Sequence, residues 1–194
     1  MDLNLGKLKM LRLLDFSLAL TGLIFIFPVL LILVILGLFD TGVPLFCQER
    51  LGKNQRPFTL YKLRSMRENT ISVASHLSNP DDITSFGRFL RRTKLDEIPQ
   101  LLNVLRGDMS IVGPRPGLAN QPDLTKARQK LGVFCVLPGI TGLAQIKGID
   151  MSMPEFLAKT DALMIKNMSV CNYIRYIGLT FVGNRRSDGI KRIS

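Results

Sequence analysis

The sequence is poor in the residues on which several common kinds of site depend. In 194 residues it has one histidine, no tryptophan and three widely spaced cysteines, Cys47, Cys135 and Cys171. Without a C-x-x-C pair, a disulfide framework and a zinc site are disfavoured, and a reducing compartment is favoured. The single histidine, His76, lies in a polar stretch and is expected in a loop, which disfavours a histidine-based triad. Any metal must then be held by carboxylates, which favours Mg²⁺.

Charged residues are missing from one long segment. Residues 16–39 form 24 consecutive positions without a charge. As a helix rising about 1.5 Å per residue, this segment is long enough to cross a hydrocarbon core about 30 Å thick. A signal peptide would have a shorter apolar core followed by small residues, and residues 40–44 offer no such cleavage site. We therefore expect a retained membrane anchor in residues 1–40 and a separate domain in residues 41–194.

Pro28, near the centre of this segment, leaves two topologies open. Proline removes a helical hydrogen bond, so the segment is either a kinked spanning helix or a re-entrant helix broken near Pro28 that returns to its starting side. Basic clusters flank the segment on both sides: Lys7, Lys9 and Arg12 before it, and Arg50, Lys53 and Arg56 after it. The positive-inside tendency would place both clusters on the cytoplasmic side, which favours the re-entrant form.

The rest of the chain predicts an α+β fold that is mostly helical with short strands. Residues 43–66 are typical of short strands or a hairpin, for which residues 52–55 would supply the turn. Helices are expected over residues 86–105, with an interruption near Pro99, and over residues 123–131 and 153–168, with Pro154 at the first position of the last one. Loops are expected at residues 68–82, 112–122 and 137–142. Residues 173–182 are apolar but interrupted by Arg175, so they are expected to lie on the membrane surface. The tail from residue 184 is expected to fray.

The most informative motif is Asp96-Glu97, which follows a run of cations. Arg88, Arg91, Arg92 and Lys94 precede the two acids, in a chain whose net charge is +11. In chemistry on a phosphate ester, an acid can attack phosphorus or hold a metal while cations neutralise the phosphate oxygens. Because proline fits only the first turn of a helix, Pro99 predicts a helix beginning at or just after Asp96, near whose N-terminus an ionised acid is stabilised. The plainer alternative is that Asp96 only caps this helix.

A second motif surrounds Arg115. Pro114 and Pro116 fix the backbone on either side of it, which would pre-organise its guanidinium for phosphate recognition. Glycines at 107, 113, 139 and 142 could let backbone N–H groups approach a diphosphate, although no Walker or G-x-G-x-x-G motif is present.

Five blocks resemble the bacterial sugar transferases, the monotopic phosphoglycosyl transferases that load a sugar phosphate onto undecaprenyl phosphate. They are Phe46–Gly52, Tyr61–Met66, Leu90–Leu102, Gly107–Pro116 and Pro138–Gln145, in the family's order. The resemblance implies a monotopic membrane protein with an N-terminal re-entrant hydrophobic helix, amphipathic interfacial helices and a cytoplasmic catalytic domain at the bacterial inner membrane. It implies transfer of a sugar 1-phosphate from a UDP-sugar to polyprenyl phosphate, with release of UMP, as the initiating step of surface glycan synthesis.

The resemblance also assigns roles to individual residues. It implies that Asp96 is the nucleophile, which forms a covalent aspartyl-phosphosugar, and that Glu97 helps to hold Mg²⁺ with it. Phosphate or substrate contacts are implied for Arg91, Arg115, Lys62 and Arg64. Pro28 matches the helix-breaking proline. Membrane lipid and downstream glycosyltransferases are the implied partners, while the oligomeric state and the sugar stay undetermined.

The C-terminal third departs from the family pattern. Leu143 and Ile149 stand where the family has tryptophan and arginine, although Lys147 could restore a substrate-binding cation nearby. Met164 replaces a usual tyrosine, Asp161 is kept, and Tyr173 stands at a later family Asp. An inactive scaffold relative is therefore one alternative. A membrane-anchored basic module for lipid or nucleic acid is another, but nucleic-acid binding is disfavoured because stacking aromatics are scarce.

Overall fold

The computed structural model describes residues 5–68, 70 and 79–182. The predictions for His76, for most of the loop at residues 68–82 and for the tail from residue 184 lie outside this part of the chain. In the described part, helices α1 to α7 and two small pairs of strands form the α+β fold that the sequence predicts.

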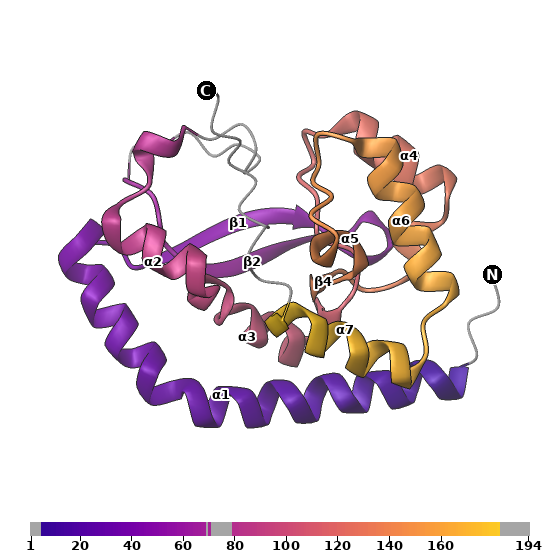
Figure 1. The fold of residues 1–194 in the computed structure, drawn as a ribbon, viewed down its shortest axis with the longest axis horizontal. Helices are drawn as coiled ribbons and strands as arrows, with labels where there is room; N and C mark the ends of the chain where they lie inside the picture. Colours follow the sequence, from indigo (N-terminus) through magenta and orange to yellow (C-terminus); the bar gives the residue numbers. More distant parts are fainter. Residues whose placement is uncertain (1–4, 69, 71–78, 183–194) are drawn as a thin grey trace.

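Helix α1, Leu5–Thr41, lies along one side of the rest of the molecule (Figure 1). Among the described residues it is the one helix that is long and apolar enough to cross a membrane. It runs through Pro28 without interruption, so the break expected there is a bend instead. Proline is a usual cause of such a bend because one hydrogen bond is missing.

Both arms of α1 pack against the same domain. On the first arm, Ala19 joins a buried cluster with Val104, and Arg12 donates hydrogen bonds to the carbonyl oxygens of Val104 at 2.6 Å and Met109 at 3.1 Å. On the second arm, Leu33 is buried in a cluster with Leu63 and Leu90. The hydroxyl of Thr84 donates to Asp40 at 2.6 Å at the end of this arm. The helix is therefore part of the core at both ends.

The first strands and helices of the domain confirm the predicted hairpin and the predicted interrupted helix. Strands β1, Leu45–Leu51, and β2, Pro57–Leu63, form an antiparallel hairpin in which Leu45 lies opposite Leu63. The short 3₁₀ turn η1, Lys53–Gln55, connects them at the predicted turn. After the 3₁₀ turn η3, Pro80–Asp82, the predicted helix at residues 86–105 is interrupted as expected: it consists of α2, Ser85–Thr93, the 3₁₀ turn η4, Leu95–Glu97, and α3, Gln100–Arg106.

The second half contains one pair of strands that the sequence did not predict, and one of them lies in the loop predicted at residues 137–142. β3, Ser110–Val112, pairs in parallel with β4, Gly139–Thr141, with Ser110 opposite Gly139. Three-residue strands are too short to show an alternating pattern, so they could not be predicted from the sequence. The remaining elements are α4, Pro122–Lys130, η5, Val133–Cys135, α5, Leu143–Ile146, α6, Pro154–Lys166, and α7, Val170–Val182. The predicted helices over residues 123–131 and 153–168 are confirmed.

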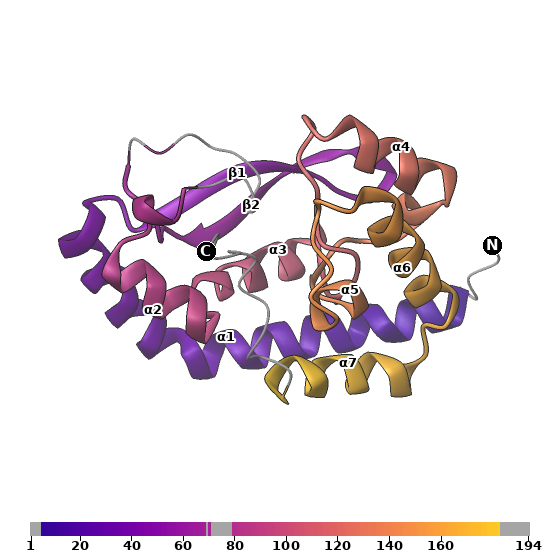
Figure 2. The same cartoon turned by 45° about the horizontal axis from the view of Figure 1, so that its top comes forward.

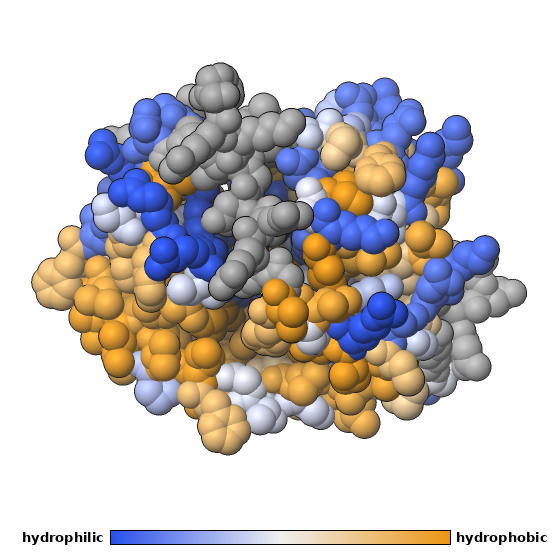
Figure 3. All heavy atoms as spheres, in the orientation of Figure 1, coloured by the Kyte–Doolittle hydropathy of each residue, from blue (hydrophilic) through white to orange (hydrophobic). Residues whose placement is uncertain are grey.

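Helices α1 and α7 form the lower layer of the molecule in two views (Figures 1 and 2). Figure 3 shows apolar side chains gathered over this lower part and hydrophilic ones over the upper part. Large exposed apolar side chains of the layer include Leu13, Phe16, Phe25 and Phe39 on α1 and Ile174 and Phe181 on α7. A surface of this kind is typical of an interaction with a membrane.

Candidate functional site

Asp96 and Glu97 lie in the turn η4, between the end of α2 and the start of α3. The chain reverses at Lys94, which adopts a left-handed conformation with φ of 56°. Helix α3 begins at Gln100, later than expected, and its N-cap is Pro99 without a side-chain capping bond. Asp96 is therefore no cap. It is only 8% exposed, and among the described residues its carboxylate accepts no hydrogen bond.

Three cations from three different elements act on the Asp96 carboxylate. They are Lys62 of β2, Arg91 of α2 and Arg115 of the loop after β3, and each favours its ionised form. Burial and the neighbouring charge of Glu97 have the opposite effect and dominate, which raises the pKa of Asp96 to about 6. The carboxylate is thus ionised near neutral pH and remains poorly solvated, as an attacking group should be.

Close packing against the hairpin positions the first two cations. Arg91 Nε donates to the hydroxyl of Ser65 at 2.9 Å. The two segments approach so closely because Gly87 has no side chain: a Cβ there would lie 2.0 Å from the carbonyl oxygen of Ser65. The amino group of Lys62 lies 5.1 Å from the centre of the Phe46 ring, and burial lowers the pKa of this ammonium to about 8.

The backbone around Arg115 is held by hydrogen bonds to four successive carbonyl groups. Gly139 N donates to Pro114 at 2.9 Å, Arg128 Nη1 to Arg115 at 2.8 Å, Arg50 Nη1 to Pro116 at 3.3 Å and Leu51 N to Gly117 at 2.9 Å. The guanidinium of Arg115 then reaches Glu97, with Nη1 3.5 Å from Oε1. The predicted fixed backbone around Arg115 is confirmed. Neighbouring segments hold it through these hydrogen bonds, in addition to its two prolines.

A buried ion pair that the sequence did not reveal supports this loop. Arg128 of α4 donates through Nε and Nη2 to Asp161 Oδ2 of α6, at 3.1 and 2.7 Å, and both residues are almost completely buried. Burial raises the pKa of Asp161, and the charge of Arg128 opposes this effect. Arg128 lies in a helix that reads as polar and exposed, so only its place in the fold distinguishes it from the other cations there.

Three of the glycines expected near a diphosphate, Gly113, Gly139 and Gly142, instead allow close packing of the backbone. A Cβ at Gly139 would lie 2.0 Å from Gly113 N, and one at Gly142 would lie 2.4 Å from Gly113 O. The N–H groups of Gly107, Gly113 and Gly139 donate to backbone carbonyls. These three N–H groups are therefore already used, and Gly113, Gly139 and Gly142 let two chain segments pack closely beside Arg115.

Two of the predicted phosphate-binding residues are not among the cations that act on Asp96. Arg64 donates through Nε to the carbonyl oxygen of Val43 at 2.9 Å, and its guanidinium lies against Phe46. Lys147 is exposed at the end of α5, and within the described chain no contact links it to Asp96. Their part in substrate binding stays a prediction. The described residues contain no group of three or more side chains that could hold a metal ion.

Fold and site together define a class of protein: a compact α+β domain on a long apolar helix, with a buried carboxylate among cations suited to phosphate chemistry. The profile of the bacterial sugar transferase family matches residues 7–185, and the chain belongs to this family.

Similar proteins carry names that fit the site. The chain is 45% identical over 130 residues to a UDP-glucose:undecaprenyl-phosphate glucose-1-phosphate transferase of Caulobacter vibrioides, covering 64% of this chain and 49% of that protein. It is 34% identical over 189 residues to a UDP-galactose-lipid carrier transferase of Erwinia amylovora, covering 88% and 39%. It is 37% identical over 184 residues to a galactosyl transferase of Streptococcus agalactiae, covering 87% and 40%. The matches thus span about half or less of each relative.

Proposed function

We propose that this protein transfers a sugar 1-phosphate from a UDP-sugar to a polyprenyl phosphate such as undecaprenyl phosphate, with release of UMP. The observation that carries the proposal is Asp96, a buried carboxylate without a hydrogen bond among the described residues, on which Lys62, Arg91 and Arg115 act. The names of the Caulobacter and Erwinia relatives supply the substrate class. This reaction would initiate assembly of a surface polysaccharide or glycoconjugate.

The reaction would proceed in two displacements at one phosphorus atom. An oxygen of Asp96 attacks the phosphorus that carries the sugar, the bond from this phosphorus to the oxygen of UMP breaks, and UMP leaves as the anion. The resulting aspartyl-phosphosugar is then attacked by a phosphate oxygen of the prenyl phosphate, which releases Asp96. Lys62, Arg91 and Arg115 neutralise the charge that develops on the phosphoryl oxygens in both steps.

The carboxylates of Asp96 and Glu97 suit a Mg²⁺ ion that is also held by the substrate phosphates. Mg²⁺ is commonly held by one or two carboxylates together with substrate phosphates and water, and the adjacent Asp96 and Glu97 offer such a set. When bound, the ion would neutralise diphosphate charge. Glu97 is partly exposed and pairs with Arg115 at 3.5 Å, so it can exchange this partner for the ion while Asp96 stays directed at phosphorus.

A monotopic arrangement best accounts for α1. The helix represents about 55 Å of helical rise, yet both of its arms pack against the same domain. If one arm crossed the bilayer away from the domain, its contacts through Leu33 or Ala19 would be lost. We therefore place residues 1–40 in one leaflet of the bacterial inner membrane, with α7 at its surface and the catalytic domain, residues 41–194, on the cytoplasmic face.

The test is whether UMP is released when no acceptor lipid is present. Purified protein mixed with UDP-sugar and Mg²⁺ should release up to one equivalent of UMP, and labelled UMP should exchange into the UDP-sugar. Asp96→Asn should abolish both, because an amide cannot act as this nucleophile. Asp123→Asn, at an exposed position of α4, is the matched control and should behave as wild type.

Two other outcomes would contradict parts of the proposal. Exchange that strictly requires prenyl phosphate, with ternary-complex kinetics, would mean direct transfer and would reduce Asp96 to a base or ligand. No UMP release from any UDP-sugar, with or without prenyl phosphate, by a folded protein would identify an inactive relative.

A further inference from the structure

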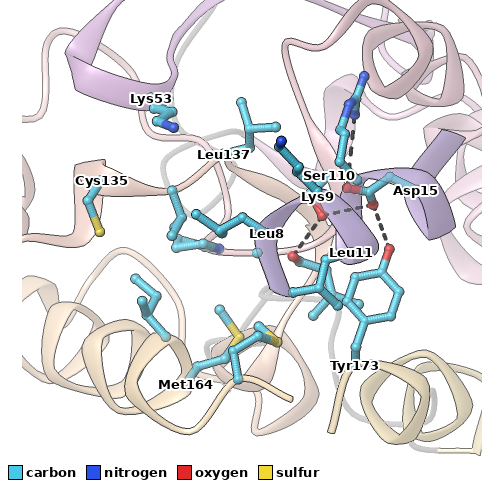
Figure 4. Close-up of a pocket in the computed structure, with 17 residues that line it drawn as sticks. Leu8, Lys9, Leu11, Asp15, Lys53, Ser110, Cys135, Leu137, Met164 and Tyr173 are labelled. Atoms are coloured by element: carbon cyan, nitrogen blue, oxygen red, sulfur yellow. Dashed lines mark hydrogen bonds and ion pairs between the residues drawn. The ribbon is translucent and has the colours of Figure 1, made fainter. Parts of the chain in front are cut away.

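A cavity lies beside the group formed by Asp96, Glu97, Lys62, Arg91 and Arg115, called here the Asp96 group, but does not include it. It has a volume of about 370 Å³ and is enclosed by the first turns of α1, strand β3, residues 135–137, the end of α6 and the start of α7 (Figure 4). Pro114 belongs to its wall, whereas Asp96, Glu97, Lys62, Arg91 and Arg115 do not. A ligand in this cavity would thus contact the base of the Arg115 loop without touching the nucleophile.

The lining divides the cavity into an apolar part and a cationic end. Leu8, Leu11 and Met164 are among the many apolar side chains that line it. In Figure 4 the side chains of Lys9 and Lys53 direct their amino groups toward the same end, away from Met164. Within the described chain neither lysine has an acidic partner within ion-pair distance.

The polar side chains of Asp15, Ser110 and Tyr173 in the wall are hydrogen-bonded to one another. Asp15 Oδ1 accepts hydrogen bonds from the hydroxyl of Tyr173 at 2.5 Å, the hydroxyl of Ser110 at 2.9 Å and the backbone N–H of Ile111 at 2.8 Å. In the apolar part of the cavity, a sugar or nucleobase would bury polar groups without partners, at a substantial free-energy cost. An apolar chain would bury apolar surface there and leave no polar group of its own unpaired.

The surroundings indicate where such a chain would come from. The elements that enclose the cavity, α1 and α7, carry the exposed apolar side chains Leu13, Phe16 and Ile174. Figure 3 shows apolar side chains gathered over this lower part of the molecule. We propose that the cavity binds one acyl chain of an anionic membrane phospholipid, whose phosphate is held by Lys9 and Lys53. The volume lies at the lower end of the range of about 300–1,000 Å³ for ligand pockets, which suits one chain rather than a whole lipid.

The prenyl phosphate acceptor does not fit this assignment. Its phosphate must reach Asp96, and no member of the Asp96 group lines the cavity. A headgroup held by Lys9 and Lys53 is thus separate from the reacting phosphates. This exclusion of the acceptor rests on the proposed function, whereas lipid retention is measured without turnover and so can fail independently of it. An acyl chain in the cavity would pack against Pro114 and so support the loop that carries Arg115.

The test measures lipid retained by the purified full-length protein. Protein in detergent is mixed with equal amounts of phosphatidylglycerol and phosphatidylcholine and examined by native mass spectrometry. Wild type should retain one phosphatidylglycerol in preference to phosphatidylcholine. A cation near an anionic lipid contributes about 1 kcal/mol, or about five-fold in affinity, so Lys9→Gln with Lys53→Gln should weaken retention about twenty-five-fold.

Two further variants separate the cavity from general surface charge. Cys135→Phe keeps all charges but fills the cavity, and should also abolish retention while the melting temperature shows that it is folded. Lys126→Gln with Lys130→Gln, both exposed on α4, should retain lipid as wild type does. Equal loss in this control pair, retention by folded Cys135→Phe, or equal retention of both lipids would overturn the proposal. Displacement of the lipid by equimolar prenyl phosphate would assign the cavity to the acceptor instead.

Discussion

At the scale of single residues, the chemistry depends on the opposite effects of burial on an acid and a base. Burial raises the pKa of Asp96 to about 6 and lowers that of Lys62 to about 8, because both charged forms lose hydration. Each residue stabilises the ionised form of the other, so both are charged together only between these two values. The reaction needs this state: an ionised nucleophile and a protonated lysine beside it.

Activity should therefore follow a bell-shaped pH profile. We expect kcat/KM to rise as pH increases through about 6, where Asp96 loses its proton, and to fall above about 8, where Lys62 loses its own. Initial rates of UMP release between about pH 5 and about pH 9 would measure both limbs. Lys62→Arg should keep the acid limb and lose the alkaline one, because a guanidinium stays protonated throughout. An unchanged alkaline limb in this variant would exclude Lys62 as its cause.

Arg115 offers a test of geometry at constant charge. Arg115→Lys keeps the positive charge but loses the planar fork that can bind two phosphate oxygens at once. The loss of one charge-assisted hydrogen bond, about 1.5–3 kcal/mol, should reduce kcat/KM about ten-fold or more. Steady-state kinetics at fixed Mg²⁺ would measure it. Near-normal turnover of the lysine variant would mean that Arg115 contributes only general surface charge.

At the scale of elements, the site is assembled by contacts between helices and loops that are remote in sequence. Helix α4 holds the carbonyl of Arg115 through Arg128, and α6 holds Arg128 through Asp161. Strand β1 holds the next carbonyl of the loop through Arg50. Helix α2 approaches the hairpin at Gly87 and so carries Arg91 to Ser65. The position of each cation is therefore a property of element packing.

Breaking the buried pair should affect both stability and activity. Asp161→Ala would leave the Arg128 guanidinium buried without its counter-charge, which typically costs about 3–5 kcal/mol. The melting temperature in detergent should fall clearly, and kcat/KM should fall with it as the Arg115 loop loses support. The control Asp123→Ala, at an exposed position of α4, should change neither the melting temperature nor kcat/KM. A melting temperature equal to wild type for Asp161→Ala would show that the pair does not hold α4 to α6.

At the scale of the whole molecule, apolar and hydrophilic surfaces are segregated. The lower layer of α1 and α7 exposes large apolar side chains, while the rest of the visible face is mostly hydrophilic (Figure 3). The Asp96 group lies above this layer, on elements that pack directly on α1. This arrangement suits chemistry in which a phosphate at headgroup depth is attached to a chain in the bilayer.

The monotopic arrangement predicts that both ends of α1 face the cytoplasm. In a variant lacking Cys47, Cys135 and Cys171, a single cysteine is placed at Gly6, at the start of α1, or at Lys130, on the domain. Neither should react with a membrane-impermeant thiol reagent applied to intact spheroplasts, and both should react after lysis. Labelling at Gly6 but not at Lys130 in intact spheroplasts would show a spanning helix.

The sequence by itself determined the local structure and the chemical type of the protein. The uncharged run of residues 16–39 required an apolar helix, and Pro154 and Pro99 marked positions where helices begin or are interrupted, because proline restricts its own backbone. The adjacent Asp96 and Glu97 after a run of cations indicated phosphate chemistry. These features depend on neighbours along the chain, and a sequence displays such neighbours directly.

Only the tertiary structure decided which polar residues act together. In the sequence, Arg128 resembles any cation of a polar helix. Its ion pair with Asp161 and its hydrogen bond to the carbonyl of Arg115 arise only from tertiary packing. The parallel pairing of β3 with β4 was likewise invisible, because three residues are too few to show a period. Burial, and with it the pKa of Asp96 and of Lys62, depends on segments far apart in the chain, since solvent is excluded only once they have packed together.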